Sequence, residues 1–402
     1  MASVMSPEND LNIAYVVNEW PSPTETFVAN EILALREYGA SVTVFALHEG
    51  AGDRVPGAPV VYRKATLVPS VREAAGRGWQ MMRKAIGLTW RSLPQLTYAL
   101  ANIPGALGFA RVARERQIHH IHGQFAHTPA DIALMIARTQ GLSASFAAHA
   151  WDIYCTGQSL AARVQAADLC VTCTRAGHRH ILSSVPPEQR DKVKWVHHGT
   201  DLERFRFHPR YEPEQPPVIL AVGRLVPKKG FETLIRACGR LNQAMDYECH
   251  IVGDGPLGPR LRKLSVEFGL ANKIRFQGRV PYSSMPDIYR EADVLAVPSI
   301  VAPDGDRDGL PNVVTEAMAT GLPVVGSRLS GIPEAVEAES TGLLFRPGDH
   351  AGLADGLRRM VTDTALRRKC IDAARQQVEE NFDFRGNCRR VYEMLMDVAQ
   401  VQ

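Results

Sequence analysis

The stretch that decides the fold is Val218-Ile-Leu-Ala-Val-Gly-Arg-Leu-Val-Pro-Lys-Lys-Gly-Phe231. Its first five residues are apolar and mostly β-branched, which is typical of a buried strand. A turn flanked by glycines follows, and apolar residues at helical spacing begin with Phe231. A strand, a glycine turn and a helix in this order are characteristic of βαβ units, so the stretch predicts a parallel α/β sheet.

The same alternation of short apolar runs and longer helical stretches extends in both directions along the chain. We expect further strands at 11–17, 41–47, 143–148, 168–173, 192–196, 248–252, 273–276, 293–297 and 323–325. A helix is expected at 24–37. The predicted fold class is therefore α/β, with two Rossmann-like parallel-sheet domains that face a central cleft.

The predicted domain boundary is a proline-rich segment. Residues 208–217 contain four prolines, which make a poor helix and a poor central strand. We expect an N-terminal domain over 1–207, a linker over 208–217 and a C-terminal domain over 218–384. Residues 385–402 are expected to form a C-terminal helix that can pack back on the N-terminal domain.

Composition places the chain among ordinary globular proteins. It has 402 residues, 45% of them hydrophobic and 22% charged, with a net charge of +3. These values exclude disordered, collagen-like and disulfide-scaffold classes. Seven scattered cysteines favour reduced thiols in the cytoplasm. The first ten residues lack the features of a signal peptide and no apolar run is long enough to span a bilayer, so we expect neither secretion nor a transmembrane segment.

The turn between Gly223 and Gly230 has the features of an anion site. Backbone N–H groups at a helix start favour negative charge, and the side chains of Arg224 and Lys229 add fixed positive charge beside them. The turn also follows the carboxyl end of a strand, where open parallel sheets bind ligands. We predict a diphosphate site here, against the alternative of a solvated basic turn.

A second candidate segment follows the strand expected at 293–297. An acidic loop at 303–311 leads into a helix that starts at Asn312. Asp308 lies on this loop and Glu316 lies about one turn into the helix. The two carboxylates can therefore flank a ligand that lies across the helix N-terminus.

Two metal sites compete with that interpretation. The sequence from Asp304 to Gly309 matches the first half of an EF-hand loop, but its twelfth position is Thr315 instead of the bidentate Glu that calcium requires. Asp304 and Asp306 also match the paired aspartates with which some sugar transferases hold a divalent cation. Because the basic turn at 224–229 already offers charge neutralisation, we expect no metal.

Together these residues resemble the retaining glycosyltransferases of the two-Rossmann-domain (GT-B) architecture, specifically the family 4 group (glycosyl transferases group 1) of bacterial polysaccharide and glycolipid transferases, including colanic-acid-type enzymes. The resemblance covers most of the chain. Its motifs are Pro21-Ser-Pro-Thr-Glu-Thr-Phe27, His120-Ile-His-Gly-Gln-Phe-Ala126, Ser145-Phe-Ala-Ala-His-Ala-Trp-Asp-Ile-Tyr154, Gly199-Thr-Asp201, Gly223-Arg224, Lys229-Gly230, Gly253-Asp-Gly-Pro-Leu257, and Asp308 with Glu316-Ala-Met-Ala319.

The resemblance implies that the N-terminal domain over 1–207 lies on the acceptor side and that the C-terminal domain over 218–384 binds the nucleotide sugar. It also implies roles for residues of this chain. Arg224 and Lys229 would bind the diphosphate of a nucleoside diphosphate sugar donor, and Glu316 would accept hydrogen bonds from its ribose. Asp308 would hold a hydroxyl of the transferred sugar, and His149 would reach that sugar from the N-terminal domain. The catalytic residues would be His149, Asp308 and Glu316. The backbone near sugar and phosphate would be that of Gly309, Leu310, Pro311 and Asn312.

The chain departs from the family pattern at two places. The family usually has Glu at both ends of the terminal motif, whereas this chain has Asp308 at the first, which bears on donor identity or rate. The glycine-rich loop after the first strand is absent, and Glu25 and Thr26 occur there instead. We assign these two to an acceptor-side pocket, together with His122 and Asp152.

The implied function is a retaining, metal-independent hexosyltransferase without a cofactor, acting on a saccharide or lipid-linked saccharide acceptor in cell-surface polysaccharide or glycolipid synthesis. Retaining glycosidases use one carboxylate as a covalent nucleophile. No residue takes that role convincingly in this family, so same-face attack by the acceptor hydroxyl is favoured. A nucleotide-sugar epimerase of the same fold and a non-catalytic nucleotide-sugar-binding protein remain alternatives.

Neighbouring histidines and cysteines invite metal or redox interpretations. Alternation along a strand sends His120 and His122 to one face and His119 to the other, so three convergent ligands are not expected. Cys170 and Cys173 have the CxxC spacing but fall in an apparently buried strand. We predict structural roles for these groups, with acceptor binding as the alternative for the histidines.

The basic excess is concentrated at 72–116, where eight basic and two acidic side chains give a net charge of +6. Tryptophan and methionine are interspersed with these cations, a composition that can lie on an anionic membrane surface. The alternative is helices packed on their own sheet with exposed arginines. No stacking or helix-turn-helix pattern accompanies the charge, so no nucleic-acid partner is expected.

Overall fold

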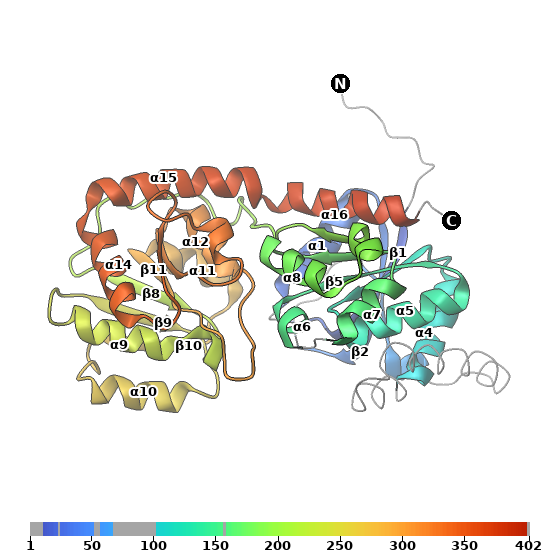
Figure 1. Ribbon diagram of the computed structural model, residues 1–402, viewed down its shortest axis with the longest axis horizontal. Helices are drawn as coiled ribbons and strands as arrows, with labels where there is room; N and C mark the ends of the chain where they lie inside the picture. Colours follow the sequence, from blue (N-terminus) through green and yellow to red (C-terminus); the bar gives the residue numbers. More distant parts are fainter. Residues whose placement is uncertain (1–10, 23–24, 52–56, 67–101, 156–157, 400–402) are drawn as a thin grey trace, which may run out of the picture. The chain divides into compact units, whose positions relative to one another are not determined.

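The computed structural model describes residues 11–22, 25–51, 57–66, 102–155 and 158–399. The chain divides into two compact units. Unit 1 comprises residues 1–173, 177–196 and 385–402, and unit 2 comprises residues 174–176 and 197–384. Each unit is built around its own parallel sheet with helices on both faces, so the predicted α/β class with two Rossmann-like domains is confirmed (Figure 1).

The sheet of unit 1 has seven strands in the order β3-β2-β1-β4-β5-β6-β7. All neighbouring pairs are parallel. The strands are β1 (Asn12–Trp20), β2 (Ser41–Glu49), β3 (Val60–Tyr62), β4 (His120–Gln124), β5 (Ser143–Ala148), β6 (Leu169–Thr172) and β7 (Val193–Trp195). The direction of winding reverses between β1 and β4, which makes this pair the topological switch point of the unit.

Successive side chains of these strands point to opposite faces of the sheet and form two hydrophobic layers, one on each face. One layer joins Val16, Phe45 and Phe146 to helices α4 (Ile103–Glu115), α5 (Thr128–Gln140), α7 (Gln158–Ala166) and α8 (Arg175–Ser184). The other joins Ile13 and Val44 to α1 (Thr26–Glu37) and to the C-terminal helix α16 (Phe384–Ala399). Helix α16 contributes Val391 and Leu395, so the end of the chain completes the core of unit 1 (Figure 1). The short helix α6 (Ala150–Cys155) follows β5.

The sheet of unit 2 has six parallel strands in the order β10-β9-β8-β11-β12-β13, with its switch point between β8 and β11. The strands are β8 (Val218–Val222), β9 (Glu248–Val252), β10 (Ile274–Gly278), β11 (Val294–Val297), β12 (Val324–Ser327) and β13 (Leu343–Phe345). One face packs on α9 (Phe231–Leu241), α10 (Gly258–Glu267) and α14 (His350–Thr362). The other packs on α11 (Met285–Arg290), α12 (Asn312–Thr320), α13 (Ile332–Ala335) and α15 (Thr364–Asn381).

The expected linker at 208–217 lies within unit 2. The Arg210 guanidinium lies 3.3 Å from the carboxylate of Asp293, which is completely buried at the start of β11. The buried Arg367 side chain of α15 donates two hydrogen bonds to the Arg210 carbonyl, at 2.9 and 2.7 Å. These contacts satisfy polar groups at the margin of the core. The chain therefore leaves unit 1 earlier than the prolines indicate, after residue 196.

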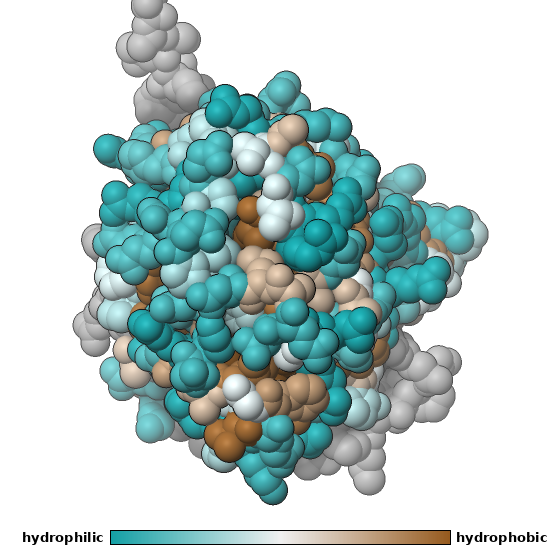
Figure 2. Space-filling model, turned by 90° about the vertical axis from the view of Figure 1, so that its left-hand side faces the viewer, coloured by the Kyte–Doolittle hydropathy of each residue, from teal (hydrophilic) through white to brown (hydrophobic). Residues whose placement is uncertain are grey.

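The surface drawn in Figure 2 is mainly hydrophilic, with apolar residues in small separate groups. Within the described part of the chain, none of the helices combines the length and the apolar character that a membrane span requires. The basic segment 72–116 lies largely outside the described residues, and only its last part is seen, in α4.

Candidate functional site

The candidate site of unit 2 lies at the carboxyl ends of β8 and β11, the two strands of the switch point. The turn 223–230 follows β8, and the loop 298–311 follows β11 and leads into α12. In open α/β sheets the crevice at this position is where ligands bind. The sequence-predicted diphosphate turn and acidic loop are therefore neighbours in the fold.

Gly230 lets these two segments approach each other closely. Its backbone has a φ of +63°, and a Cβ atom at this residue would lie 1.9 Å from the carbonyl oxygen of Pro298. Beside this contact the backbone N–H of Ile300 donates to the carbonyl of Lys228 at 2.8 Å. Glycine adopts the left-handed backbone without strain and has no Cβ atom to collide with Pro298. Gly230 therefore allows the turn and the loop to lie this close together.

Lys229 and Asp308 form an ion pair across the switch point. Their Nζ and Oδ2 atoms lie 3.0 Å apart. The same oxygen accepts a 2.6 Å hydrogen bond from the Ser299 hydroxyl, and Asp308 is only 7% exposed. Arg224, on the same turn, is exposed and forms no ion pair with any residue that the structure describes. The site thus has one cation, Lys229, paired with the buried carboxylate of Asp308, and a second cation, Arg224, that is exposed to solvent.

The paired aspartates of the second metal hypothesis have partners of their own. Lys228 Nζ lies 3.0 Å from Oδ2 of Asp306. An oxygen of Asp304 accepts a hydrogen bond from the Asp306 backbone N–H at 3.0 Å. A cation at this pair would compete with the ammonium of Lys228 for the Asp306 carboxylate.

The backbone between the loop and α12 presents a helix N-terminus to the site. Pro311 is the N-cap residue, and α12 begins at Asn312, as the sequence predicts. The Gly309 carbonyl accepts a 2.8 Å hydrogen bond from the Gly331 backbone N–H, which holds the approach to the helix. The first N–H groups of a helix have no intrahelical acceptor and favour an anion.

Glu316 lies inside α12 and is 5% exposed. Its Oε2 accepts a 2.7 Å hydrogen bond from the Tyr289 hydroxyl, and its Oε1 accepts one of 3.1 Å from Tyr282. Burial raises the pKa of the Glu316 carboxyl, and the two tyrosine hydrogen bonds oppose that rise. A carboxylate has about four acceptor positions, so two remain for hydroxyl groups of a ligand.

In unit 1, two of the predicted acceptor-side residues lie inside the protein. His122 is 1% exposed, and its Nδ1 lies 2.7 Å from the hydroxyl of Ser145 on the neighbouring strand. Burial lowers the pKa of His122 to about 4, so the ring is neutral near pH 7. Asp152 is also buried, and its Oδ2 accepts hydrogen bonds from the backbone N–H groups of Ala126 and His149, both at 3.0 Å. His122 is therefore hydrogen-bonded within the sheet, and Asp152 holds the backbone of Ala126 and His149 in place.

Glu25 and Thr26 lie at the start of α1, after the carboxyl end of β1. Glu25 is the N-cap residue, and Thr26 is the first residue of the helix. Burial, reinforced by the charge of Glu19, raises the pKa of Glu25 to about 7. A half-buried carboxyl that titrates near neutral pH is a candidate functional group in a crevice.

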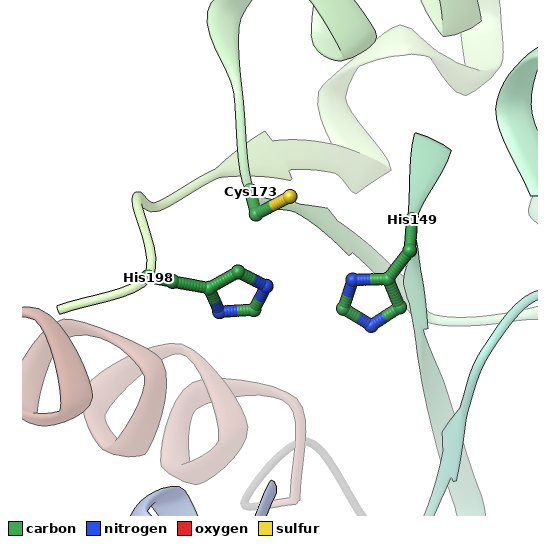
Figure 3. Close-up of side chains that lie close together, drawn as sticks. All are labelled: His149, Cys173 and His198. Carbon is green, nitrogen blue, oxygen red and sulfur yellow. The ribbon is translucent and has the colours of Figure 1, made fainter. Parts of the chain in front are cut away.

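His149 directly follows β5, as the sequence predicts. Its ring lies 5.1 Å from that of Phe27 and 4.7 Å from that of Phe125, measured between centroids. Figure 3 shows the ring beside the thiol of Cys173, which follows β6. Ligand atoms of these two side chains lie within 4.8 Å of each other. Cys173 is half-buried at the strand end, whereas Cys170 is buried in the strand as predicted.

Sequence reasoning missed three residues that hold the donor-side carboxylates. Ser299 follows β11 by two residues, so the carboxyl-end rule could have identified it. Tyr282 and Tyr289 precede Glu316 by about thirty residues, and no local pattern connects them with it.

Comparison with known proteins shows which protein family unit 2 is similar to. Residues 203–377 match the family described as glycosyl transferases group 1. They span nearly all of unit 2, including the turn after β8, the acidic loop and α12. Together with the two parallel-sheet domains, this match gives the chain the GT-B fold of glycosyltransferases, with a unit 2 that is similar to glycosyl transferases group 1.

Among curated proteins the chain is similar to the putative colanic acid biosynthesis glycosyltransferase WcaL of Escherichia coli, with 28% identity over 93% of this chain and 96% of that protein. It is 35% identical to the amylovoran biosynthesis glycosyltransferase AmsK of Erwinia amylovora, over 55% of this chain and 54% of that protein. The chain is therefore similar to glycosyltransferases that are named for colanic acid and amylovoran biosynthesis.

Solved structures agree in fold. Sucrose-phosphate synthase from Thermosynechococcus elongatus superposes with a TM-score of 0.74 at 20% identity, covering 97% of this chain and all of that one. HepE of Anabaena, solved in complex with UDP, superposes with a TM-score of 0.72 at 20% identity, covering 96% of this chain and all of HepE.

Proposed function

We propose that the protein is a retaining, metal-independent hexosyltransferase that moves a hexose from a nucleoside diphosphate sugar to a saccharide or lipid-linked saccharide acceptor. The observation that carries the proposal is the Lys229–Asp308 ion pair at the switch point of unit 2. The ion pair lies on the turn and the loop that adjoin the N-terminus of α12, and this position supports the binding of the diphosphate and the sugar of one donor side by side.

Each donor-side group suits one part of such a substrate. Arg224 and Lys229 offer positive charge to the diphosphate, and the first turn of α12 offers N–H groups. Glu316, held by two tyrosines, can accept hydrogen bonds from a ribose. When Lys229 turns to the diphosphate, Asp308 is released to accept a hydrogen bond from a sugar hydroxyl while Ser299 still holds it.

The relatives support a nucleotide donor without fixing its base. HepE has been solved in complex with UDP-glucose. The Mycobacterium tuberculosis relative with 29% identity is named a GDP-mannose-dependent mannosyltransferase, and it matches 65% of this chain. UDP-glucose and GDP-mannose are therefore the first donors to test.

The proposed reaction needs no cofactor. The acceptor oxygen forms a bond to the anomeric carbon on the face from which the diphosphate leaves, and the bond between that carbon and the phosphate oxygen breaks. The acceptor proton passes to the departing diphosphate. Arg224 and Lys229 stabilise the negative charge that develops on the leaving group, which is commonly the largest catalytic effect.

Unit 1 is proposed to bind the acceptor, with Glu25, Thr26 and His149 at the carboxyl edge of its sheet and with Asp152 positioning the backbone of His149. His149 is proposed to assist at the reaction centre. We place the enzyme in the cytoplasm, with contact to the inner face of the membrane through 72–116. Flotation with anionic liposomes at low salt tests this contact, and no binding would exclude it.

Product analysis tests the proposed function. We expect the purified protein to convert a nucleoside diphosphate hexose and a saccharide acceptor into a glycoside whose anomeric configuration, read by NMR, is that of the donor. Activity should survive EDTA. Donor converted to an isomer without acceptor would identify an epimerase, and binding without turnover would identify a scaffold. An inverted product, or activity lost in EDTA and restored by manganese, would contradict the proposal.

A further inference from the structure

The loops at the carboxyl edge of the unit 1 sheet carry a continuous group of aromatic rings. The ring centroids of Phe125 and His127 are 5.6 Å apart, and those of His127 and Trp151 are 5.9 Å apart. Behind them the ring of Phe27 lies 6.3 Å from that of Phe125. We call Phe125, His127 and Trp151 the aromatic platform.

The position of the platform is that of a ligand crevice. Phe125 and His127 directly follow β4, one of the two strands of the switch point, and Trp151 lies in α6 just after β5. Phe27 lies in α1, which follows the other switch-point strand, β1. The rings therefore come from successive loops at the place where doubly wound sheets bind their ligands.

Asp152 ties these loops together. Its Oδ2 accepts hydrogen bonds from the backbone N–H groups of Ala126, between the two platform residues of the β4 loop, and of His149, after β5. Because Asp152 is the neighbour of Trp151 in α6, one buried carboxylate fixes the backbones that carry all three rings. A surface fixed before binding loses little conformational entropy when a ligand arrives.

The backbone of Phe125 is strained. Its φ is +81°, a region that bulky side chains rarely occupy. Such conformations are energetically costly and occur preferentially at ligand sites. The ring of this strained residue is stacked with that of His127, at an interplanar angle of 20°.

The chemistry of the platform suits an uncharged, partly apolar ligand. Trp151 is 49% exposed, and it is one of the few large apolar side chains at the surface of the described residues. Burial and the charge of Arg163 lower the pKa of His127 to about 4, so this ring is neutral near pH 7 and can both donate and accept a hydrogen bond. Phosphate binding, in contrast, requires concentrated positive charge.

We propose that the aromatic platform binds a pyranose ring of the saccharide acceptor, with Trp151 stacked on its C–H face and His127 bonded to a hydroxyl. This inference rests on the proposed function, which requires such an acceptor. The flat faces of aromatic rings match the apolar face of a pyranose, and the few polar groups around them fix its orientation.

Saturation-transfer-difference NMR on the full chain tests the platform directly. The probes are the methyl glycosides of glucose, galactose, mannose and fucose, with uridine and guanosine as competing flat ligands. We expect transfer to ring C–H protons of at least one glycoside, a Kd about tenfold higher in Trp151→Ala, and a smaller change in Trp151→Phe. Phe268→Ala, at an aromatic side chain of unit 2 that is 39% exposed, is the matched control and should bind as wild type.

The other outcomes separate this inference from the proposed function. Equal glycoside affinity in wild type and Trp151→Ala would overturn the platform, as would nucleosides that bind through Trp151 while no glycoside does. Glycoside binding that is absent while UDP-glucose or GDP-mannose stabilises the protein would overturn the platform and leave the proposed function intact. Glycoside binding through Trp151 without binding of any nucleotide sugar would support the platform and overturn the proposed function.

Discussion

Lys229 Nζ lies 3.0 Å from Oδ2 of Asp308, and this pair joins the turn after β8 to the loop after β11. Both residues belong to segments that the sequence marks as candidate sites, but only the fold brings them together. An ammonium and a carboxylate in contact stabilise each other. In the proposed function, each would become a ligand group when a diphosphate draws the ammonium of Lys229 away from Asp308.

Lys229→Ala should lower kcat/KM for the donor by about 10²–10³, because it removes a charge that stabilises the leaving group. The control is Lys228→Ala, the adjacent lysine whose partner is Asp306. Steady-state kinetics at saturating acceptor compare the two. An equal loss of kcat/KM in both variants would show that only the overall positive charge of the turn matters. An unchanged kcat/KM in Lys229→Ala would show that Lys229 does not act on the donor.

Tyr289→Phe should weaken nucleoside diphosphate binding by about tenfold, since it removes the 2.7 Å hydrogen bond that orients Oε2 of Glu316. Isothermal titration with UDP and GDP measures the effect. Tyr211→Phe is a matched control, because its hydroxyl bonds Asp372 at an exposed position. Unchanged nucleotide affinity in Tyr289→Phe would show that Glu316 does not depend on this tyrosine for binding.

Gly230→Ala should destabilise unit 2 by about 1–3 kcal/mol, because the new methyl group would meet the Pro298 carbonyl in a left-handed backbone. Gly269→Ala separates the two causes. Gly269 has a φ of +69°, but no atom lies within 4 Å of the place that its Cβ would take, so only the backbone cost applies. Urea unfolding should show the larger loss at Gly230, and equal losses would contradict the close approach of turn and loop.

Glu25 should make stability depend on pH. Its pKa of about 7 lies above the ordinary value of 4.5, so its stabilising contribution is present below about pH 4.5 and is lost as pH rises through about 7. Glu25→Gln mimics the protonated group, and its melting temperature should therefore rise relative to wild type between about pH 5 and about pH 8. Glu19→Gln, which removes a neighbouring charge, should shift this dependence to lower pH. A pH-independent difference would show that Glu25 titrates normally.

The sequence predicts the sheet well because buried parallel strands carry uninterrupted apolar runs. The expected ranges 143–148, 218–222 and 248–252 coincide with β5, β8 and β9. The three-residue strands β3 and β13 escape prediction, whereas β7, which is equally short, lies within the expected range 192–196. A pattern of three residues is at the limit of what periodicity can detect.

The candidate site is predictable only in part. The segments that carry Lys229 and Asp308 are identified by their position after strands, which is a local property. The partners of Glu316 are not, because Tyr282, just before α11, and Tyr289, within α11, reach it through the packing of this segment on α12. His122 shows the converse: a histidine near a strand end suggests a ligand, but its ring is satisfied inside the sheet by Ser145.

The measurement that tests the central claim most directly is a thermal-shift titration with a panel of nucleoside diphosphate hexoses, on wild type, Lys229→Ala and Lys228→Ala. A ligand present at about 100 times its Kd stabilises the folded state by about 2.7 kcal/mol. We predict that at least one donor raises the melting temperature of wild type and Lys228→Ala, and that the shift is lost in Lys229→Ala. No shift with any donor, or the same shift in Lys229→Ala, would contradict the account.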